Sequence, residues 1–168
     1  MRVLTIDNPD DSAVLRAKSS DLSVEALRSD DYKSLAELML ATVTHPSQDG
    51  VGIAAPQVGI NRRVVAVQRF DKSEILPDGS ESNPFEVYPN IRIVSMSDSV
   101  EPGPEGCLSV PDRSGDVMRS KEIVIEYADV TRLDEADYMV RETINGFTAV
   151  IFQHEVDHLE GILYIDRL

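Results

Sequence analysis

The residues best suited to chemistry are His154, Glu155 and His158, which lie within the five-residue segment His-Glu-Val-Asp-His. Residues four apart share one face of a helix, so both imidazoles can reach one cation. Glu155 is rotated by about 100° around the helix axis, which places its carboxylate beside a reacting water rather than among the ligands. Two histidine ligands with an adjacent carboxylate are typical of metal-dependent hydrolysis. The segment therefore predicts a catalytic metal site.

A site of this kind needs a third protein ligand and leaves a further position for water or substrate. After His158 the only acidic residues are Glu160 and Asp166, and Glu160 points away from the histidine face. We therefore expect the third ligand upstream, where Cys107 is the single cysteine of the chain. A lone cysteine is by default a small buried apolar residue, but its thiolate would complete a Cys/His/His set. Such a set suits Zn²⁺, Fe²⁺, Co²⁺ or Ni²⁺.

The elements that must position these residues follow from local patterns. Residues 146–160 have the spacing of one helix, with Asn145 as its cap and Gly161 as its stop. Helical spacing also predicts a scaffold helix over 30–44, capped by Ser29 or Asp30. The segments that we expect to be strands are 64–67, 85–94, 122–128, 138–144 and 162–165. We expect residues 1–23 to be irregular, with a turn at 8–11, and residues 71–84 to form a polar surface loop or a hairpin tip. Strands before a late helix, without regular alternation, indicate an α+β fold.

Composition excludes several classes of protein. The 168 residues have the length of one domain, and 42% of them are hydrophobic, which is enough to form a core. The formal net charge of −14 argues against a DNA-binding protein and against adhesion to an anionic membrane. No apolar run reaches the roughly 18 residues that span a bilayer, and the N-terminal segment has no signal-peptide core. We therefore expect a cytoplasmic protein.

Three segments resemble the signature motifs of the peptide deformylases. They are Gly-Val-Gly-Ile-Ala-Ala-Pro-Gln at 50–57, Glu-Gly-Cys-Leu-Ser at 105–109 and Gln-His-Glu-Val-Asp-His at 153–158. The resemblance covers nearly the whole chain and implies one catalytic domain over 1–168, with antiparallel sheets packed around the HExxH helix and an N-terminal helix. It implies removal of the formyl group from the N-terminal formylmethionine of newly synthesised polypeptides. It also implies one divalent metal ion per chain, natively Fe²⁺, and is compatible with a transient ribosome contact.

The resemblance also implies roles for the residues of these motifs. The implied metal ligands are Cys107, His154 and His158. Hydrolysis of a formamide needs a nucleophilic water, stabilisation of the developing oxyanion and a proton for the leaving amine. Glu155 would serve as general acid and base. The side-chain amide of Gln57 and the backbone N–H of Leu108 would stabilise the oxyanion.

Further residues are expected to bind the substrate or to support the ligands. The implied substrate-binding residues are Val51, Gly52, Glu105, Gly106, Phe147, Val150 and Ile151. Asp157 is an acid within a mostly buried helix, where it is either partly solvated or paired with Arg119, and the resemblance favours a buried ion pair with Arg119. We expect Gln153 to orient a ligand through a hydrogen bond.

Two positions depart from the family pattern, and two other interpretations remain open. Ser114 stands where many deformylases carry an arginine that reaches the substrate, and Gly103 replaces a commonly larger residue. A zincin-type endopeptidase would need a third ligand after His158. A closed structural metal site would need a fourth ligand, and His45 is the one remaining histidine that could supply it. This interpretation gives Glu155 no role.

Overall fold

The computed structural model describes residues 2–168. The helices are α1 (Pro9–Arg16), α2 (Val24–Arg28), α3 (Asp30–Val43) and α4 (Gly146–Leu159). Short 3₁₀ turns are η1 (Ala55–Val58), η2 (Phe70–Lys72) and η3 (Tyr164–Arg167). Within residues 2–168, no helix has both the length and the apolar character needed to cross a membrane.

The strands form antiparallel sheets. The first sheet has the order β1 (Gly52–Ala54), β2 (Val64–Gln68), β5 (Phe85–Pro89). The second has the order β10 (Met139–Asn145), β9 (Glu122–Ala128), β6 (Arg92–Met96). Two hairpins complete the set: β7 (Val100–Cys107) with β8 (Val110–Ser120), and β3 (Glu74–Ile75) with β4 (Glu81–Ser82).

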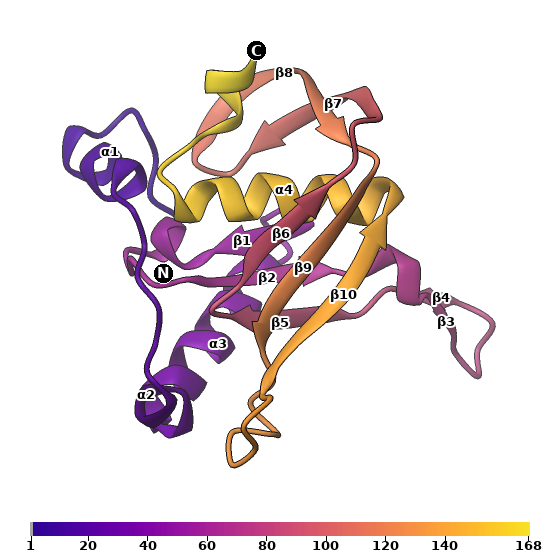
Figure 1. Ribbon diagram of the computed structural model, residues 1–168. Helices are drawn as coiled ribbons and strands as arrows, with labels where there is room; N and C mark the ends of the chain where they lie inside the picture. The colour runs from indigo at the N-terminus through magenta and orange to yellow at the C-terminus, as the bar shows by residue number, and fades with distance from the viewer. Residues whose placement is uncertain (1) are drawn as a thin grey trace.

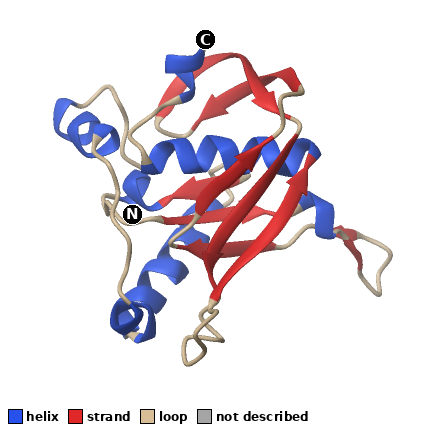
Figure 2. Cartoon of the chain, viewed as in Figure 1, coloured by secondary structure: helices blue, strands red, loops and turns tan. Residues whose placement is uncertain are grey.

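Helix α4 lies at the centre of the molecule. The β7–β8 hairpin lies along one side of it, and the two three-stranded sheets cover other sides (Figure 1). In Figure 2 the strands surround this helix, while α2 and α3 lie next to each other at one side of the molecule and α1 lies apart from them. Because α4 has neighbours on several sides, it buries much of its circumference, including Ile151, Phe152 and Val156. The expected α+β fold with antiparallel sheets is confirmed.

Local signals predicted the two longest helices well. Helix α3 begins after Ser29, whose side chain accepts a hydrogen bond from the backbone of Tyr32. Helix α4 follows Asn145, which has an extended backbone at the N-cap position. The chain leaves α4 through Gly161, whose φ of 73° is the left-handed conformation that favours glycine.

The prediction for residues 1–23 was wrong, because helix α1 occupies part of this segment. Asn8 and Pro9, interpreted as a turn, are instead the N-cap and first residue of this helix. The Asn8 side chain accepts hydrogen bonds from the backbone N–H groups of Asp10 and Asp11 at 2.9 and 3.3 Å. The same residue types favour turns and helix starts, which is why the pattern misled.

Two strand predictions also need correction. The expected strand 85–94 is broken at Asn90, whose φ of 56° turns the chain from the first sheet into the second. The expected strand 162–165 instead leads into the turn η3. Its apolar residues Leu163 and Tyr164 are buried beside β8, and Asp166 accepts a hydrogen bond from the Leu163 backbone at 3.0 Å. Burial rather than strand pairing therefore explains that apolar run.

Candidate active site

Strand β7 and helix α4 bring the three expected ligands together. Cys107 is the last residue of β7, and His154 and His158 lie one turn apart on α4. One ligating atom from each of the three side chains lies within 4.8 Å of the other two. Sγ of Cys107 and Nε2 of His158 are 3.3 Å apart. One thiolate and two imidazoles at this separation form a donor set that fits a divalent transition metal.

Cys107 and His154 line a cavity of about 740 Å³ between the segment before β1, the end of β7 and helix α4. Twelve of the sixteen expected site residues line it, whereas His158, Gln153, Asp157 and Arg119 do not. The twelve are Val51, Gly52, Gln57, Glu105, Gly106, Cys107, Leu108, Phe147, Val150, Ile151, His154 and Glu155. Asp49, Pro104, Asp112 and Arg113 also line it, and the sequence analysis assigned no role to these four.

Glu155 is buried at the wall of this cavity, with 4% of its surface exposed. Burial raises the pKa of its carboxyl group to about 7, which suits a group that exchanges protons near neutral pH. Among residues 2–168, no side chain or backbone group forms a hydrogen bond with Oε2 of Glu155. A Cβ atom on Gly52 would lie 2.7 Å from Oε1 of Glu155, so only glycine lets strand β1 approach this carboxylate.

Gln57 is buried and held in one orientation by two hydrogen bonds. Its Oε1 accepts from the backbone N–H of Ala54 at 2.9 Å, and its Nε2 donates to Oγ of Ser109 at 3.1 Å. The same Nε2 lies 3.6 Å from Sγ of Cys107. The amide N–H groups are therefore turned toward the ligand cluster. Ser109 is a supporting residue that the sequence analysis missed, although it belongs to the motif at 105–109.

A chain of hydrogen bonds links β7, β8 and α4 behind the ligands. Oε1 of Glu105 lies 2.8 Å from Nδ1 of His154. The Glu105 carboxylate also accepts two hydrogen bonds from Arg119, at 2.8 and 2.9 Å. Arg119 donates a further hydrogen bond to Asp157 at 2.7 Å, so the expected pair is present, with Arg119 buried and Asp157 partly exposed. Arg167, which the sequence analysis did not consider, also donates to Asp157, at 2.6 and 2.8 Å.

The electrostatics of this region favour positive charge beside Glu105. Burial opposes ionisation of Glu105, but hydrogen bonds with Arg119 and His154 lower the pKa of its carboxyl group to about 2. Burial likewise opposes a charged His154, but contacts with Cys107 and Glu105 raise the pKa of its imidazole to about 10. A proton and a metal ion can both supply this positive charge. Burial lowers the pKa of His158, which keeps that imidazole in the neutral form that binds metals.

The contacts of Gln153 differ from those expected. Its Oε1 accepts from the backbone N–H of Ser120 at 3.0 Å, and its Nε2 donates to the backbone carbonyls of Ser120 and Ala149 at 2.9 and 3.0 Å. Gln153 thus attaches strand β8 to helix α4 rather than contacting a ligand side chain. The prediction followed from its place beside His154, but adjacent residues point in different directions on a helix.

A zincin-type endopeptidase or a closed structural metal site would need further ligands, and the candidate residues for them lie away from Cys107, His154 and His158. Glu160 forms an ion pair with Arg63 at 2.6 Å, and Asp166 forms an ion pair with Arg16. His45 is exposed and its Nδ1 lies 2.6 Å from Oγ of Ser47. The cluster of ligand atoms found in residues 2–168 therefore draws neither on the chain after His158 nor on the spare histidine.

Comparison with known proteins gives a consistent result. The profile of the polypeptide deformylase family matches residues 1–168. A peptide deformylase of Leptospira biflexa is 37% identical over 167 residues, which cover 99% of this chain and 87% of that protein. A peptide deformylase of Roseiflexus sp. is 36% identical over 174 residues, which cover 99% of this chain and 88% of that protein.

Solved structures agree in both fold and sequence. The Met-Ala-Ser-bound class I type b peptide deformylase of Acinetobacter baumannii has a TM-score of 0.81 and 35% identity, covering 100% of this chain and 98% of that one. The peptide deformylase of Thermotoga maritima has a TM-score of 0.78 and 31% identity, covering 99% and 96%. Together with the metal-ligand cluster, these matches show that the chain belongs to the peptide deformylase family, the metal-dependent hydrolases that remove the formyl group from the N-terminal methionine of nascent polypeptides.

Proposed function

We propose that Cys107, His154 and His158 hold one divalent metal ion, and that Glu155 is the general acid and base for hydrolysis of N-formylmethionyl peptides. One observation carries the proposal: ligand atoms of Cys107, His154 and His158 lie within 4.8 Å of one another, and two of these residues line a cavity together with the buried carboxylate of Glu155. We infer Fe²⁺ as the native ion, because of the family resemblance. Zn²⁺, Ni²⁺ and Co²⁺ also suit this donor set.

The metal would supply Lewis acidity, which lowers the pKa of a water molecule and polarises the formyl carbonyl group. Glu155 accepts the proton that this water loses as its oxygen adds to the formyl carbon. The same carboxyl group then delivers the proton to the amide nitrogen while the carbon–nitrogen bond breaks. The products are formate and a peptide with a free α-amino group.

Gln57 and Leu108 are the proposed donors to the oxyanion. The Gln57 carbonyl oxygen is fixed by Ala54 and one of its N–H groups by Ser109, so the second N–H, which is directed toward Sγ of Cys107, is the one that would donate to the oxyanion. Leu108 follows Cys107 in the turn between β7 and β8 and lines the cavity, and its proposed role uses only the backbone N–H. Donors that are held in place before the reaction stabilise developing charge most effectively.

The substrate would bind as an extended strand. Strand β1 pairs with β2 on one side only, so its other edge can form backbone hydrogen bonds with a peptide. Val51 and Gly52 lie at this edge, and Glu105 and Gly106 lie across the cavity on β7. The first side chain of the peptide, that of methionine, would pack against the apolar wall formed by Phe147, Val150 and Ile151 on α4. The proposed partners are nascent peptides in the cytoplasm, with transient contact with the ribosome.

The test is formate release from formyl-Met-Ala-Ser by protein that has been purified anaerobically. We expect release with added Fe²⁺ or Ni²⁺, and loss of release after chelation. Glu155→Gln should abolish turnover while still binding one metal ion per chain. Glu122→Gln, which changes an exposed acid on β9, is the matched control and should retain full activity.

Two results would overturn the proposal. One is the absence of formate release from a protein that binds one metal ion per chain. The other is metal-dependent cleavage of unformylated peptides in place of formate release, which would favour the endopeptidase interpretation.

A further inference from the structure

A buried arginine follows strand β2, and neither the reaction nor the metal site described above uses it. Arg69 is 2% exposed, although arginine is rarely buried without partners. Its guanidinium donates two hydrogen bonds to Asp71, at 2.8 Å each, and one to the hydroxyl oxygen of Tyr88 at 2.7 Å. It also donates to the carboxylate of Glu142 at 3.2 Å. Arg69 therefore ties the end of β2 to η2, β5 and β10.

The partners of Arg69 are themselves held in place. The hydroxyl group of Tyr127 donates to Glu142 at 2.5 Å, and that of Tyr88 donates to Glu86 at 2.5 Å. These side chains come from both three-stranded sheets, so the guanidinium is fixed from several directions. Arginine suits this position because its planar group offers five donors in a fixed arrangement.

The residue before Arg69 holds part of the proposed substrate-binding edge. The backbone N–H of Gln68 donates to the backbone oxygen of Val51 at 2.8 Å. The register of β1 with β2 begins one residue later, where Gly52 pairs with Val67. Val51 and Gly52 line the cavity of the candidate active site, at the edge where we expect the peptide to bind. A shift of the end of β2 would therefore move the beginning of that edge.

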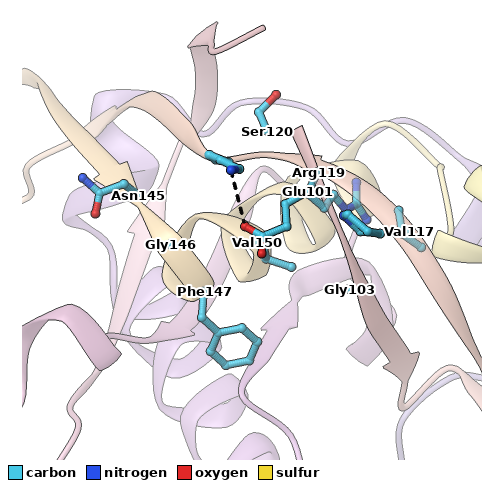
Figure 3. A pocket seen from close by; sticks show the side chains of 11 residues that line it. Glu101, Gly103, Val117, Arg119, Ser120, Asn145, Gly146, Phe147 and Val150 are labelled. Carbon is cyan, nitrogen blue, oxygen red and sulfur yellow. Dashed lines mark ion pairs between the residues drawn. The ribbon is translucent and has the colours of Figure 1, made fainter. Parts of the chain in front are cut away.

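The residue after Arg69 packs against helix α4. The ring centres of Phe70 and Phe147 are 5.4 Å apart. Figure 3 shows Phe147 at the beginning of α4, with its ring pointing away from Gly103 and Val117. The contact between the two rings is apolar and does not depend on the hydrogen bonds of Arg69. The wall formed by α4 should therefore keep its place when Arg69 is replaced.

We propose that Arg69 is a positioning residue for the part of the peptide that follows the formylmethionine. It fixes the end of β2, and β2 holds Val51 at the edge that forms backbone hydrogen bonds with the peptide. The inference rests on the proposed function, because it assumes that the substrate binds along β1. The substrates concerned are formylated peptides that continue beyond the methionine, since formylmethionine alone makes fewer backbone contacts with this edge.

The test compares Arg69→Lys with Arg63→Lys on metal-loaded protein. Lysine keeps the positive charge but cannot donate two parallel hydrogen bonds to Asp71. Arg63 is the matched control, because it is also buried, with 6% of its surface exposed, and lies at the opposite end of β2. Formate release is measured with N-formylmethioninamide and with formyl-Met-Ala-Ser. Calorimetry measures binding of Met-Ala-Ser, and NMR measures hydrogen exchange of the Gln68 amide.

For Arg69→Lys we expect KM for formyl-Met-Ala-Ser and the dissociation constant of Met-Ala-Ser to rise by about three- to tenfold, the usual effect of one lost hydrogen bond. The kcat values for both substrates, and KM for N-formylmethioninamide, should change by less than about twofold, since the metal ligands are untouched. The Gln68 amide should exchange at least about tenfold faster. Arg63→Lys should change none of the substrate constants.

Tyr88→Phe tests the same link by a milder change. It removes only the hydroxyl group that accepts a hydrogen bond from Arg69, and the ring can stay in place. We expect a smaller rise in KM for formyl-Met-Ala-Ser, again without a change for N-formylmethioninamide. This variant decides the question if Arg69→Lys does not fold.

Equal losses for the two substrates in Arg69→Lys, or an unchanged KM for formyl-Met-Ala-Ser, would overturn the inference. The same pattern of loss in Arg63→Lys would overturn it as well, because reduced stability alone would then explain the effect. Failure of the proposed function would look different: the wild type would release no formate from either substrate. Calorimetry with Met-Ala-Ser and exchange of the Gln68 amide would still report whether Arg69 holds this edge.

Discussion

Oε1 of Glu105 lies 2.8 Å from Nδ1 of His154, and this contact joins the middle of strand β7 to the proposed metal helix. The ionised carboxylate acts as acceptor, so Nδ1 of His154 acts as donor and Nε2 is left for the metal. Because Arg119 donates to both Glu105 and Asp157, the orientation of a ligand depends on residues from β7, β8 and α4 together.

Replacing Glu105 with glutamine should weaken metal binding. The amide keeps the size of the side chain but removes the negative charge that faces His154. We expect affinity to fall by about 10- to 100-fold, the usual effect of losing such an outer hydrogen bond. Competition with a chelator measures the affinity. Glu101→Gln, on the same strand but at an exposed position, is the control, and equal affinities for the two variants would contradict the assigned role.

Replacing Arg119 with alanine should loosen metal retention and reduce stability. The change leaves Glu105 buried without its main partner, and breaking a buried ion pair costs about 3–5 kcal/mol. Arg167→Ala removes the other arginine that contacts Asp157, but this arginine is largely exposed, so the loss should stay below about 1 kcal/mol. Urea unfolding and metal content per chain measure both effects. Unchanged metal content in Arg119→Ala would refute the role.

Replacing Gln57 with alanine should lower kcat by about 10²- to 10³-fold, as expected when one oxyanion donor is removed. Metal content should stay at the wild-type level, since Gln57 is not a proposed ligand. Ser109→Ala removes the hydroxyl that accepts from the Gln57 amide, and we expect a smaller loss in the same direction. Formate release under saturating peptide gives both values. A Gln57→Ala enzyme with wild-type kcat would exclude this donor.

Gly79 and Gly161 both have a positive φ, but only Gly161 packs closely against another segment. Alanine substitutions at the two positions therefore distinguish the cost of backbone strain alone from the cost of strain plus a steric clash. Gly79 has a φ of 84° and open space around a Cβ atom, so Gly79→Ala should cost about 1–2 kcal/mol from conformation alone. Gly161 has a φ of 73°, and a Cβ atom there would lie 2.2 Å from the backbone oxygen of Arg16. Gly161→Ala should therefore cost more, because it also forces helix α1 away from the end of α4. Equal losses in urea unfolding would be incompatible with this contact.

The sequence predicted helix α4 and its ligands because both depend on local spacing. His154 and His158 are one helical turn apart, and Gly161 ends the helix wherever the rest of the chain lies. The need for a third ligand pointed to Cys107, the single cysteine of the chain, and the resemblance to peptide deformylases added Gln57 and the reaction. Contacts between segments that are distant in the sequence cannot be deduced from the spacing of residues within one segment.

The supporting contacts could not be predicted in the same way. Glu105 meets Arg119 across a separation of 14 residues and His154 across 49, through a hairpin that the sequence analysis did not predict. Strand β7 contains prolines at 102 and 104, and β8 carries polar residues on its exposed side, so neither shows a clear alternation. The bridging role of Glu105 becomes visible only when this hairpin packs against α4.

The central claim is that Cys107, His154 and His158 form one metal site beside Glu155. A crystal structure of the zinc-loaded protein, with anomalous scattering recorded at the zinc edge, tests it most directly. We predict one zinc ion, about 2.3 Å from Sγ of Cys107 and about 2.0–2.1 Å from one nitrogen of each histidine, with Glu155 outside the ligand set. Zinc bound without Cys107, or directly ligated by Glu155, would contradict the claim.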